Sequence, residues 1–504
     1  MQTQTLQTRP QSRLSVISET RYKWWALSCT SLGMLLAATN SGTLIIALPS
    51  LERALHTSLL ALVWVILAYM IAATVLVLSA GRLSDLFGRK RAYVGGFLLF
   101  AVASLGAGFA SDATVLILWR ILQGVGSAFL FANAAALVTD AFPKQQLGLA
   151  MGANTMIAAV GLVLGPVLGG ALVAISWHWV FWFNVPIALA GAAWGAIVLR
   201  ELSKPDQLRG YDLPGTATFV LGLTGLVLGV SRGGLSGWSD PLALGGLITA
   251  AVLLPAWVVI EQHARAPMLD LSLFRSRLFG AAAAAAFING LARFALMFVF
   301  VFYFQGAQGA DPIRAGIELI PLALGMLIAS PIAGIYADRH GSRALAAAGM
   351  ALTGAGLAAM TTLQVHSPYW QSAVWLAVVG VGSGMFNSPN TSAMMGAVPA
   401  HRRGIAAGAR TLLQNTGAVI SIALVLAVIT SAIPKPTLFA IFSGLTKGLS
   451  SAKLAPFIAN MHLALWMLAG VASLGVLVCL MRPRHVAEQA GFEAPQALDA
   501  RAGA

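Results

Sequence analysis

Three arginines, Arg120, Arg293 and Arg410, lie inside long apolar stretches of the sequence. A charged side chain is costly in such a setting and usually faces a partner or a polar cavity. Of the 17 Asp and Glu residues, only Glu318 and Asp140 fall inside such apolar stretches, and each lies near an end of its stretch. No carboxylate is therefore central in a stretch. We therefore expect an interior that disfavours permanent cations and accepts neutral, zwitterionic or anionic amphiphiles. Hydrogen bonding to helix carbonyls, or snorkelling, is the alternative for each arginine and fits Arg410 best.

A polar segment, TNSGT at residues 39–43, interrupts the first apolar stretch without any charge. Asn40 and Thr43 within it are candidate liners of a polar cavity, and the amide side chains deeper in the sequence that share this property are Asn133, Asn154, Asn289 and Gln414. For each of them alone, an interhelical hydrogen bond without ligand contact is the alternative. Glu318 is a candidate proton acceptor, although its position four residues after Arg314 also fits an ordinary ion pair.

The elements that must position these residues are membrane-spanning helices. Of the 504 residues, 58% are hydrophobic and 10% charged, whereas about 25% charged is usual for a soluble chain. Apolar runs of about 20 residues, the length that a helix needs to cross a bilayer, recur along the sequence. We expect an all-α membrane protein with fourteen spans, at about residues 24–48, 60–80, 92–110, 114–139, 147–173, 177–199, 215–232, 242–260, 280–305, 315–337, 345–363, 371–396, 404–431 and 459–481.

The distribution of basic residues predicts the orientation. An even number of spans places both termini on one side, and Lys and Arg accumulate in the terminal segments and the even-numbered loops. Because such residues gather in cytoplasmic loops, we expect a multi-pass protein of the cytoplasmic (inner) membrane with both termini in the cytoplasm. The net charge of +14 then reflects loop bias and not a nucleic-acid surface. The two cysteines, Cys29 and Cys479, cannot form a disulfide framework or a metal cluster.

An internal repeat is visible in the sequence. The tetrapeptide GVGS occurs at 124–127 and at 380–383, and the same offset of 256 residues maps Gly161 onto Gly417. A second pair, GRLSD at 81–85 and GIYAD at 334–338, has an offset of 253. We predict two parallel-duplicated six-helix bundles, 24–199 and 280–481, joined by two inserted helices and a linker at 200–279, with terminal segments 1–23 and 482–504. Halves related in this way form a substrate site between them near the bilayer midplane.

The segment GRLSDLFGRKR, residues 81–91, carries the clearest motif. Gly81 permits close helix approach, Gly88 permits a tight turn, and Asp85 can pair with Arg89. The spacing recurs as Gly334 and Asp338 in the second half. At these residues the chain resembles the major facilitator superfamily.

Further segments resemble the fourteen-helix drug/proton antiporter branch of that superfamily, the EmrB/QacA-like multidrug exporters. They are WVILAY (64–69), WHWVFWFNVP (177–186) and YFQGAQGADPIRAGIELIP (303–321). LWRILQGVGSA (118–128) resembles the fourth-span motif of the whole superfamily, and GLVLGPVLGG (161–170) resembles the fifth-span motif of its antiporters. The resemblance implies that Arg120 is a buried functional arginine and that Asp140 joins the motif loop, with Arg89 as its expected partner. It also implies a helix-bend motif that controls opening of the cavity, formed by Gly161, Gly165, Pro166 and Gly169.

The same resemblance implies secondary active efflux of small amphipathic or hydrophobic compounds across the lipid bilayer by alternating access, coupled to protons. The coupling residue, however, is changed. The family usually carries an Asp shortly before an Ala-Leu-Pro sequence, and aligning on Ala47-Leu48-Pro49 places Asn40 there. Asn does not titrate near neutral pH. Uncoupled or differently coupled transport of neutral, anionic or lipid-like substrates is therefore the alternative.

Other classes of function find little support in the sequence. It contains no His-Glu-x-x-His and no Cys-x-x-Cys segment, so we expect neither an enzyme nor a metal or other cofactor. It contains no Gly-Lys dipeptide and hence no Walker A loop, so we do not expect ATP as a partner. A membrane sensor that binds without transporting is a further alternative, although only a short tail follows the last predicted span.

Overall fold

The computed structural model describes residues 19–55, 57, 59–143, 146–201, 212–264, 267, 269, 271–399, 403–430 and 451–483. Every regular element in these ranges is a helix. The predicted segment 482–504 lies outside the described residues except for its first two positions, and so does most of the predicted loop at 431–459.

The helices account for all fourteen predicted spans, some of them as consecutive pairs. They are α1 (Glu19–Leu55), α2 (Leu59–Phe87), α3 (Arg89–Ala107), α4 (Ala113–Ala141), α5 (Leu147–Ile175), α6 (Trp179–Trp182), α7 (Asn184–Val198), α8 (Leu213–Ser236), α9 (Pro241–His263), α10 (Arg277–Phe302), α11 (Pro312–Glu318), α12 (Ile320–His340), α13 (Arg343–Ala359), α14 (Tyr369–Gly396), α15 (Arg403–Thr430) and α17 (Ser451–Leu480). Short non-α turns adjoin two of them: η2 (Leu271–Arg275) precedes α10, η3 (Tyr303–Ala307) follows α10, and η4 (Met360–Thr362) follows α13. Ten helical stretches among the described residues are long and apolar enough to cross a membrane. The all-helical membrane architecture is thus confirmed, and the number of fourteen spans stays a prediction.

Local chemistry explains where several helices begin. Asp112 precedes α4 and accepts hydrogen bonds from the backbone N–H groups of Thr114 and Val115 at 2.8 and 3.0 Å. Asp311 caps α11 in the same way, with Pro312 at the first turn. Such side chains satisfy N–H groups that have no partner within the helix. The break between α6 and α7 falls at Phe183, and the side-chain amide of Asn184, the first residue of α7, donates back to the Val180 carbonyl at 3.1 Å and competes with the helical ladder.

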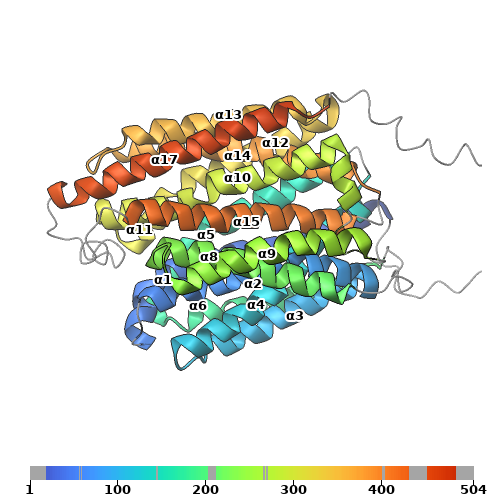
Figure 1. The fold of residues 1–504 in the computed structure, drawn as a ribbon, viewed down its shortest axis with the longest axis horizontal. Helices are drawn as coiled ribbons and strands as arrows, with labels where there is room; N and C mark the ends of the chain where they lie inside the picture. Colours follow the sequence, from blue (N-terminus) through green and yellow to red (C-terminus); the bar gives the residue numbers. More distant parts are fainter. Residues whose placement is uncertain are drawn as a thin grey trace, which may run out of the picture.

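Two groups of helices pack within themselves and then against each other (Figure 1). In the first group, α1 packs on α4, α5 and α7, and α4 packs on α2 and α3. In the second group, α14 packs on α12 and α13, α17 packs on α10 and α13, and α15 packs on α10. The groups meet where α5 contacts α12 and α14 and where α15 contacts α2 and α4. The pair α8 and α9 lies along α15 and also contacts α2 through α8.

Equivalent glycines make equivalent contacts in the two groups. Gly124 packs against Tyr69 and Ala72, and its repeat mate Gly380 packs against Leu322 and Gly325. Gly126 packs against Gly96 and Phe100, and Gly382 against Gly349 and Thr353. Each partner position is displaced by 253 residues, as are the motifs at 81–85 and 334–338. The predicted duplication therefore extends from the sequence to the helix contacts.

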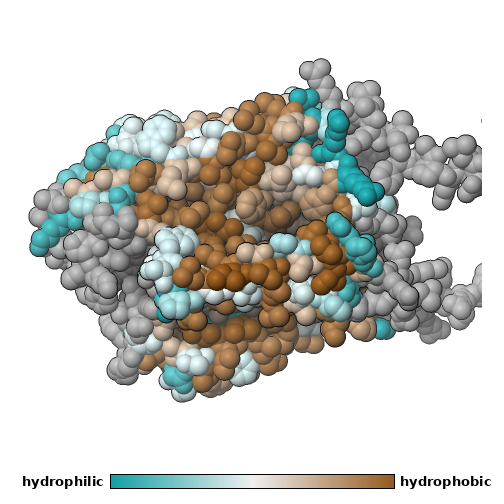
Figure 2. Space-filling view, in the orientation of Figure 1, coloured by the Kyte–Doolittle hydropathy of each residue, from teal (hydrophilic) through white to brown (hydrophobic). Residues whose placement is uncertain are grey.

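The outer surface is apolar around the middle of the molecule. Figure 2 shows hydrophobic side chains over the central part of the visible face and hydrophilic ones toward its two ends. Exposed large hydrophobic residues such as Ile248, Val252 and Val259 on α9 contribute to this surface. The interior by contrast holds both cysteines, Cys29 and Cys479, as buried free thiols. A lipid-facing belt of this kind fits a multi-pass membrane protein.

Candidate functional site

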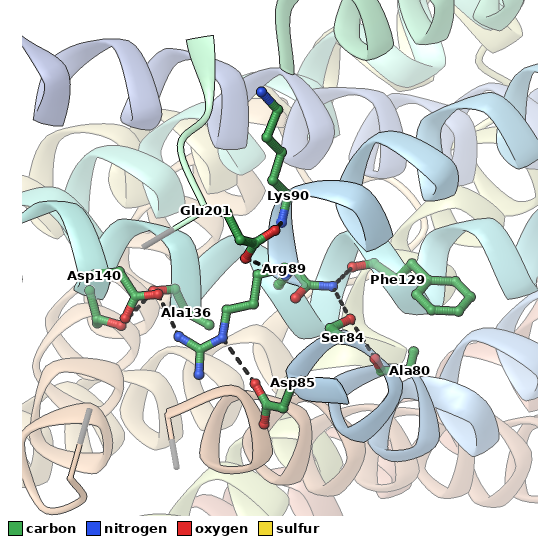
Figure 3. A network of polar contacts seen from close by, with 11 residues as sticks. Ala80, Ser84, Asp85, Arg89, Lys90, Phe129, Ala136, Asp140 and Glu201 are labelled. Carbon is green, nitrogen blue, oxygen red and sulfur yellow. Dashed lines mark hydrogen bonds and ion pairs between the residues drawn. The ribbon is translucent and has the colours of Figure 1, made fainter. Parts of the chain in front are cut away.

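Arg89 lies at the centre of a buried ion network at one end of the bundle (Figure 3). Its Nε atom is 3.0 Å from a carboxylate oxygen of Asp85 on α2, and its Nη1 atom is 2.5 Å from a carboxylate oxygen of Asp140 on α4. The side chains of Arg89, Asp85 and Asp140 are 1%, 8% and 9% exposed. One guanidinium thus joins the ends of α2 and α4 to the start of α3 through charge-assisted hydrogen bonds.

Glu201, just after α7, is a member of this network that the sequence analysis missed. Its carboxylate accepts hydrogen bonds from the backbone N–H groups of Arg89 at 2.8 Å and Lys90 at 3.2 Å. Gly88 precedes them with φ of 104°, a conformation that favours glycine, and it supplies no side-chain cap. An acid more than a hundred residues away therefore caps α3 and complements its dipole. The uncapped Gly-Arg-Lys start of a helix was the signal available in the sequence.

Asn133 links α4 to α2 a short distance from Arg89. Its amide nitrogen donates to the Ser84 hydroxyl at 2.7 Å and to the Phe129 carbonyl at 2.8 Å. Asn133 is 1% exposed in this conformation. The contact is the interhelical hydrogen bond that the sequence left open as its alternative to cavity lining.

In the second group of helices, Gly334 is buried on α12, and Asp338 follows it one turn later. Gly81 is buried on α2.

The glycines of the predicted bend motif form a close contact between α5 and α1. A Cβ atom at Gly161 would lie 2.7 Å from Ala38, one at Gly165 would lie 2.8 Å from the Gly42 Cα, and one at Gly169 would lie 2.8 Å from the Thr43 carbonyl oxygen. Residue numbers increase together on α5 and on α1 along this series of contacts, so the two helices run in the same direction. Pro166 lies within α5 between these positions. The missing side chains allow backbone-to-backbone packing.

Arg120 forms a closed polar cluster among α1, α2, α3 and α4. It donates to the carbonyl of Val65 at 3.1 Å, to Oδ1 of Asn40 at 3.3 Å and to Oε1 of Gln123 at 2.5 Å. Its guanidinium carbon lies 4.3 Å from the centre of the Tyr69 ring. Gln123 in turn donates to the same Asn40 oxygen at 3.3 Å and to the Ser104 hydroxyl. Arg120 is 1% exposed, and no carboxylate of the described ranges contacts it.

The repeat shows that this polar cluster belongs to one half alone. Applying the offsets of the glycine contacts, the positions equivalent to Tyr69, Arg120 and Gln123 are Leu322, Leu376 and Val379. All three counterparts are buried hydrophobic residues. The first group of helices therefore carries a polar cluster where the second carries ordinary apolar packing.

The second group has its own polar residues, at other positions. Arg410 on α15 donates to Oε1 of Gln414 at 2.9 Å, and Gln414 donates to Oδ1 of Asn387 on α14 at 3.0 Å. Arg293 on α10 lies 4.6 Å from the centre of the Phe294 ring, and its Nη1 atom is 3.9 Å from the thioether sulfur of Met326 on α12. Both arginines are partly exposed. Asn387 was not singled out from the sequence, because only the fold brings it to Gln414.

The remaining predicted residues make contacts either between two helices or within one helix. Asn154 on α5 accepts a hydrogen bond from Ser31 on α1 at 3.0 Å, and Asn289 donates to the Met350 sulfur at 3.4 Å. Thr43 donates back to the Asn40 carbonyl at 3.2 Å. Glu318 forms the ion pair with Arg314 at 2.9 Å, with its second oxygen buried and without a hydrogen-bond partner. Within the described ranges no three His, Cys, Asp or Glu side chains gather as metal ligands.

Comparison with known proteins identifies the family. The profile described as Major Facilitator Superfamily matches residues 30–421 and, separately, residues 282–499. The chain belongs to the major facilitator superfamily. Among relatives of this superfamily member, the multidrug resistance protein Stp of Mycobacterium tuberculosis is 32% identical over 406 residues, 79% of this chain and 74% of the relative. The tetracenomycin C resistance and export protein of Streptomyces glaucescens is 28% identical over 395 residues, 78% and 73% of the two chains.

Further relatives broaden the range of substrates named for the superfamily. The riboflavin transporter RibZ of Clostridioides difficile is 28% identical over 396 residues, 78% of this chain and 86% of that protein. Among solved structures, the human organic anion transporter TETRAN superposes with a TM-score of 0.62 at 14% identity, covering 91% of this chain and 99% of that one. The structural likeness shows that this superfamily member has the superfamily's fold.

Proposed function

We propose that the protein is a secondary active exporter of small amphipathic or hydrophobic compounds, of the fourteen-helix drug/proton antiporter branch, which works by alternating access in the cytoplasmic membrane. Two relatives whose names state export or multidrug resistance support this proposal. The domain division at 24–199, 200–279 and 280–481 belongs to it, because alternating access requires two bundles that move against each other.

The observation that carries the proposal is the position of the Arg89 network. Arg89 fixes the ends of α2 and α4 relative to each other through Asp85 and Asp140. The same two helices contact α15 of the other group, for instance where Gly408 packs on Val77 and Leu78 of α2. A buried ion network that sets the placement of an interface between two bundles is suited to act as a gate. We place this gate at the cytoplasmic end, where Gly81, Gly88, Gly334 and Asp338 complete the motif.

The mode of coupling is the finer part of the proposal. Proton antiport is the default for this branch, yet Asn40 replaces the usual acid. Two donors, Arg120 and Gln123, point at the Asn40 side-chain oxygen, and no acid of the described ranges is paired with Arg120. This arrangement favours uncoupled or differently coupled transport as the second candidate. If protons are moved, Glu318 and Asp140 are the acids available at the ends of the spans.

Transport by vesicles containing the purified protein tests the proposal. We expect vesicles with wild-type protein to move an amphipathic dye that control vesicles retain, and Asp140→Asn to abolish most of that movement while the protein still folds. An internal pH dye reports whether protons move in exchange. Dye movement that is the same with and without the protein would contradict the proposed function.

A further inference from the structure

Arg293 on α10 and Arg410 on α15 each have a polar atom that no group of the described residues satisfies. Nε of Arg293 and Nε of Arg410 are both buried without a hydrogen-bond partner. Within the described ranges, the polar contact of Arg293 is a thioether sulfur at 3.9 Å, and that of Arg410 is the neutral Gln414 at 2.9 Å. Neither side chain contacts a carboxylate within the described part of the chain. An uncompensated buried cation is destabilising, and it becomes favourable when an anion pairs with it.

Arg120 shows the contrast within the same molecule. Its Nε atom donates to Val65, its Nη1 atom donates to Asn40 and Gln123, and Arg120 is absent from the buried polar atoms that lack a hydrogen-bond partner. It is also sealed from solvent, whereas Arg293 and Arg410 are partly exposed. The protein itself therefore supplies the hydrogen-bond acceptors for Arg120, whereas Arg293 and Arg410 each keep a buried donor for which a ligand can supply the acceptor.

Comparison of the two repeats shows that the fold does not require arginine at these two positions. Gly161 packs on Leu35 and Thr39, and its mate Gly417 packs on Phe287 and Leu291, which gives an offset of 252 residues between α1 and α10. By that offset the counterpart of Arg293 is Ser41, and by the offset of 256 the counterpart of Arg410 is Asn154. The fold is thus built once with neutral residues at both positions and once with arginines.

The geometry also places the two positions within reach of one small molecule. Gly290 packs against the backbone of Gln414. Arg293 follows Gly290 by about one turn on α10, and Arg410 precedes Gln414 by about one turn on α15. The helices α10 and α15 run parallel to each other, as their counterparts α1 and α5 do. At about 1.5 Å per residue, the two arginines are separated by about 10 Å along the helix axes. The side chain of Met326, which touches Arg293, comes from α12, a helix that packs against α5 of the other group.

We propose that Arg293 and Arg410 form a binding site for an organic anion, with the acidic group of an amphipathic carboxylate or sulfonate at Arg293 and the rest of the molecule extending toward Arg410 and Gln414. This assignment rests on the proposed function, since the site is part of the transport cavity. Phe294 supplies an apolar wall beside the guanidinium of Arg293. The site distinguishes acids from neutral compounds by charge and leaves the Arg120 cluster outside the ligand contacts.

Binding of pyrenebutyrate and of its uncharged amide to the protein in phosphatidylcholine nanodiscs tests the site. We expect wild type to bind the acid more tightly than the amide, and Arg293→Gln to weaken acid binding by about 10- to 100-fold with little change for the amide, since a hydrogen bond to a charged group contributes on this scale. Arg410→Gln should weaken acid binding less, because Gln414 remains. Arg275→Gln, at an exposed arginine outside the site, is the matched control and should leave the preference unchanged.

Thermal stability gives a second measurement that does not depend on transport. Pyrenebutyrate should raise the Tm of wild type but not that of Arg293→Gln, and Arg293→Lys, which keeps the charge, should retain part of this increase. Equal binding of acid and amide by wild type, or an acid preference that survives Arg293→Gln, would overturn the proposal. Loss of the preference in nanodiscs that contain phosphatidylglycerol would assign the site to a lipid headgroup and would overturn its assignment to a soluble amphiphile.

The failure of this proposal is distinguishable from that of the proposed function. Protein-dependent movement of the neutral amide across vesicle membranes, without any preference for the acid, would leave the exporter in place and remove the anion site. Binding of the acid at Arg293 with no movement of either compound would retain the site and remove the exporter.

Discussion

At the scale of single residues, the side-chain oxygen of Asn40 accepts hydrogen bonds from two donors, an environment that would also suit a carboxylate. Two donors converge on its side-chain oxygen at 3.3 Å, and its amide nitrogen is buried without a partner. Asn40→Asp keeps the shape and gives Arg120 a charged partner, so we expect the variant to fold and to gain proton movement coupled to substrate. Flux measured with an internal pH dye checks this. Asn40→Ala is the control and should lose stability by about 1–3 kcal/mol, because both donors lose an acceptor.

Proton flux through the wild-type protein in the same assay shows whether coupling requires an acid at position 40. If the unmodified protein already exchanges protons for substrate, the titrating group lies elsewhere, and Glu318→Gln becomes the next variant to measure. If Asn40→Asp folds but moves no protons, an acid at this position is insufficient for coupling in this chain.

The ion pair between Arg89 and Asp140 should contribute more to stability than the Glu201 cap of α3. Asp140→Asn breaks a buried ion pair, for which a loss of about 3 kcal/mol is expected. Its Tm should therefore fall clearly below that of Glu201→Gln, which only weakens an exposed helix cap worth about 1 kcal/mol or less. Circular dichroism melting of both variants in one detergent measures the difference. A larger loss in Glu201→Gln would show that capping of α3, and not the ion pair, holds this end together.

At the scale of helices, the contact between α1 and α5 has no room for side chains. A Cβ atom at Gly165 would come within 2.8 Å of the Gly42 Cα and 3.1 Å of the Thr39 carbonyl oxygen, both of them backbone atoms that cannot move independently. We expect Gly165→Ala to cost about 1–3 kcal/mol and to slow transport, as overpacking generally does. Gly245→Ala on α9, where nothing lies within 4 Å, is the matched control. Equal Tm values for the two variants would contradict the close packing.

The all-helical membrane architecture could be predicted from the sequence, because apolar length and composition decide it, and ten helical stretches of the described residues are long and apolar enough to cross a membrane. The Arg89 pairing was also predictable, since the spacing of Asp85 and Arg89 is local. Glu201 was not, because its partners lie more than a hundred residues away and only the path of α7 brings it to α3. The partners of the buried amides were equally beyond the sequence. Only tertiary contacts show that Asn133, Asn154 and Asn289 form interhelical hydrogen bonds.

At the scale of the whole molecule, the basic loops predict an orientation that can be measured directly. With both termini in the cytoplasm, a green fluorescent protein fused after residue 504 should fluoresce in cells, whereas alkaline phosphatase at the same position should remain inactive. Fusions in the short segment between α3 and α4, after Ser111, should give the opposite pattern. Active phosphatase at the C-terminus would reverse the predicted topology and move the Arg89 network to the outer face.

The two cysteines give the molecule a practical property. Cys29 and Cys479 are both buried in the packed helices, so the native chain offers water-soluble maleimides little to react with, and the wild-type background can be kept for labelling. A pair of cysteines introduced on the solvent-facing ends of α3 and α13 would then accept spin labels or fluorophores selectively. The distance between those probes, followed while substrate is added, would record the relative motion of the two halves without first removing any native thiol.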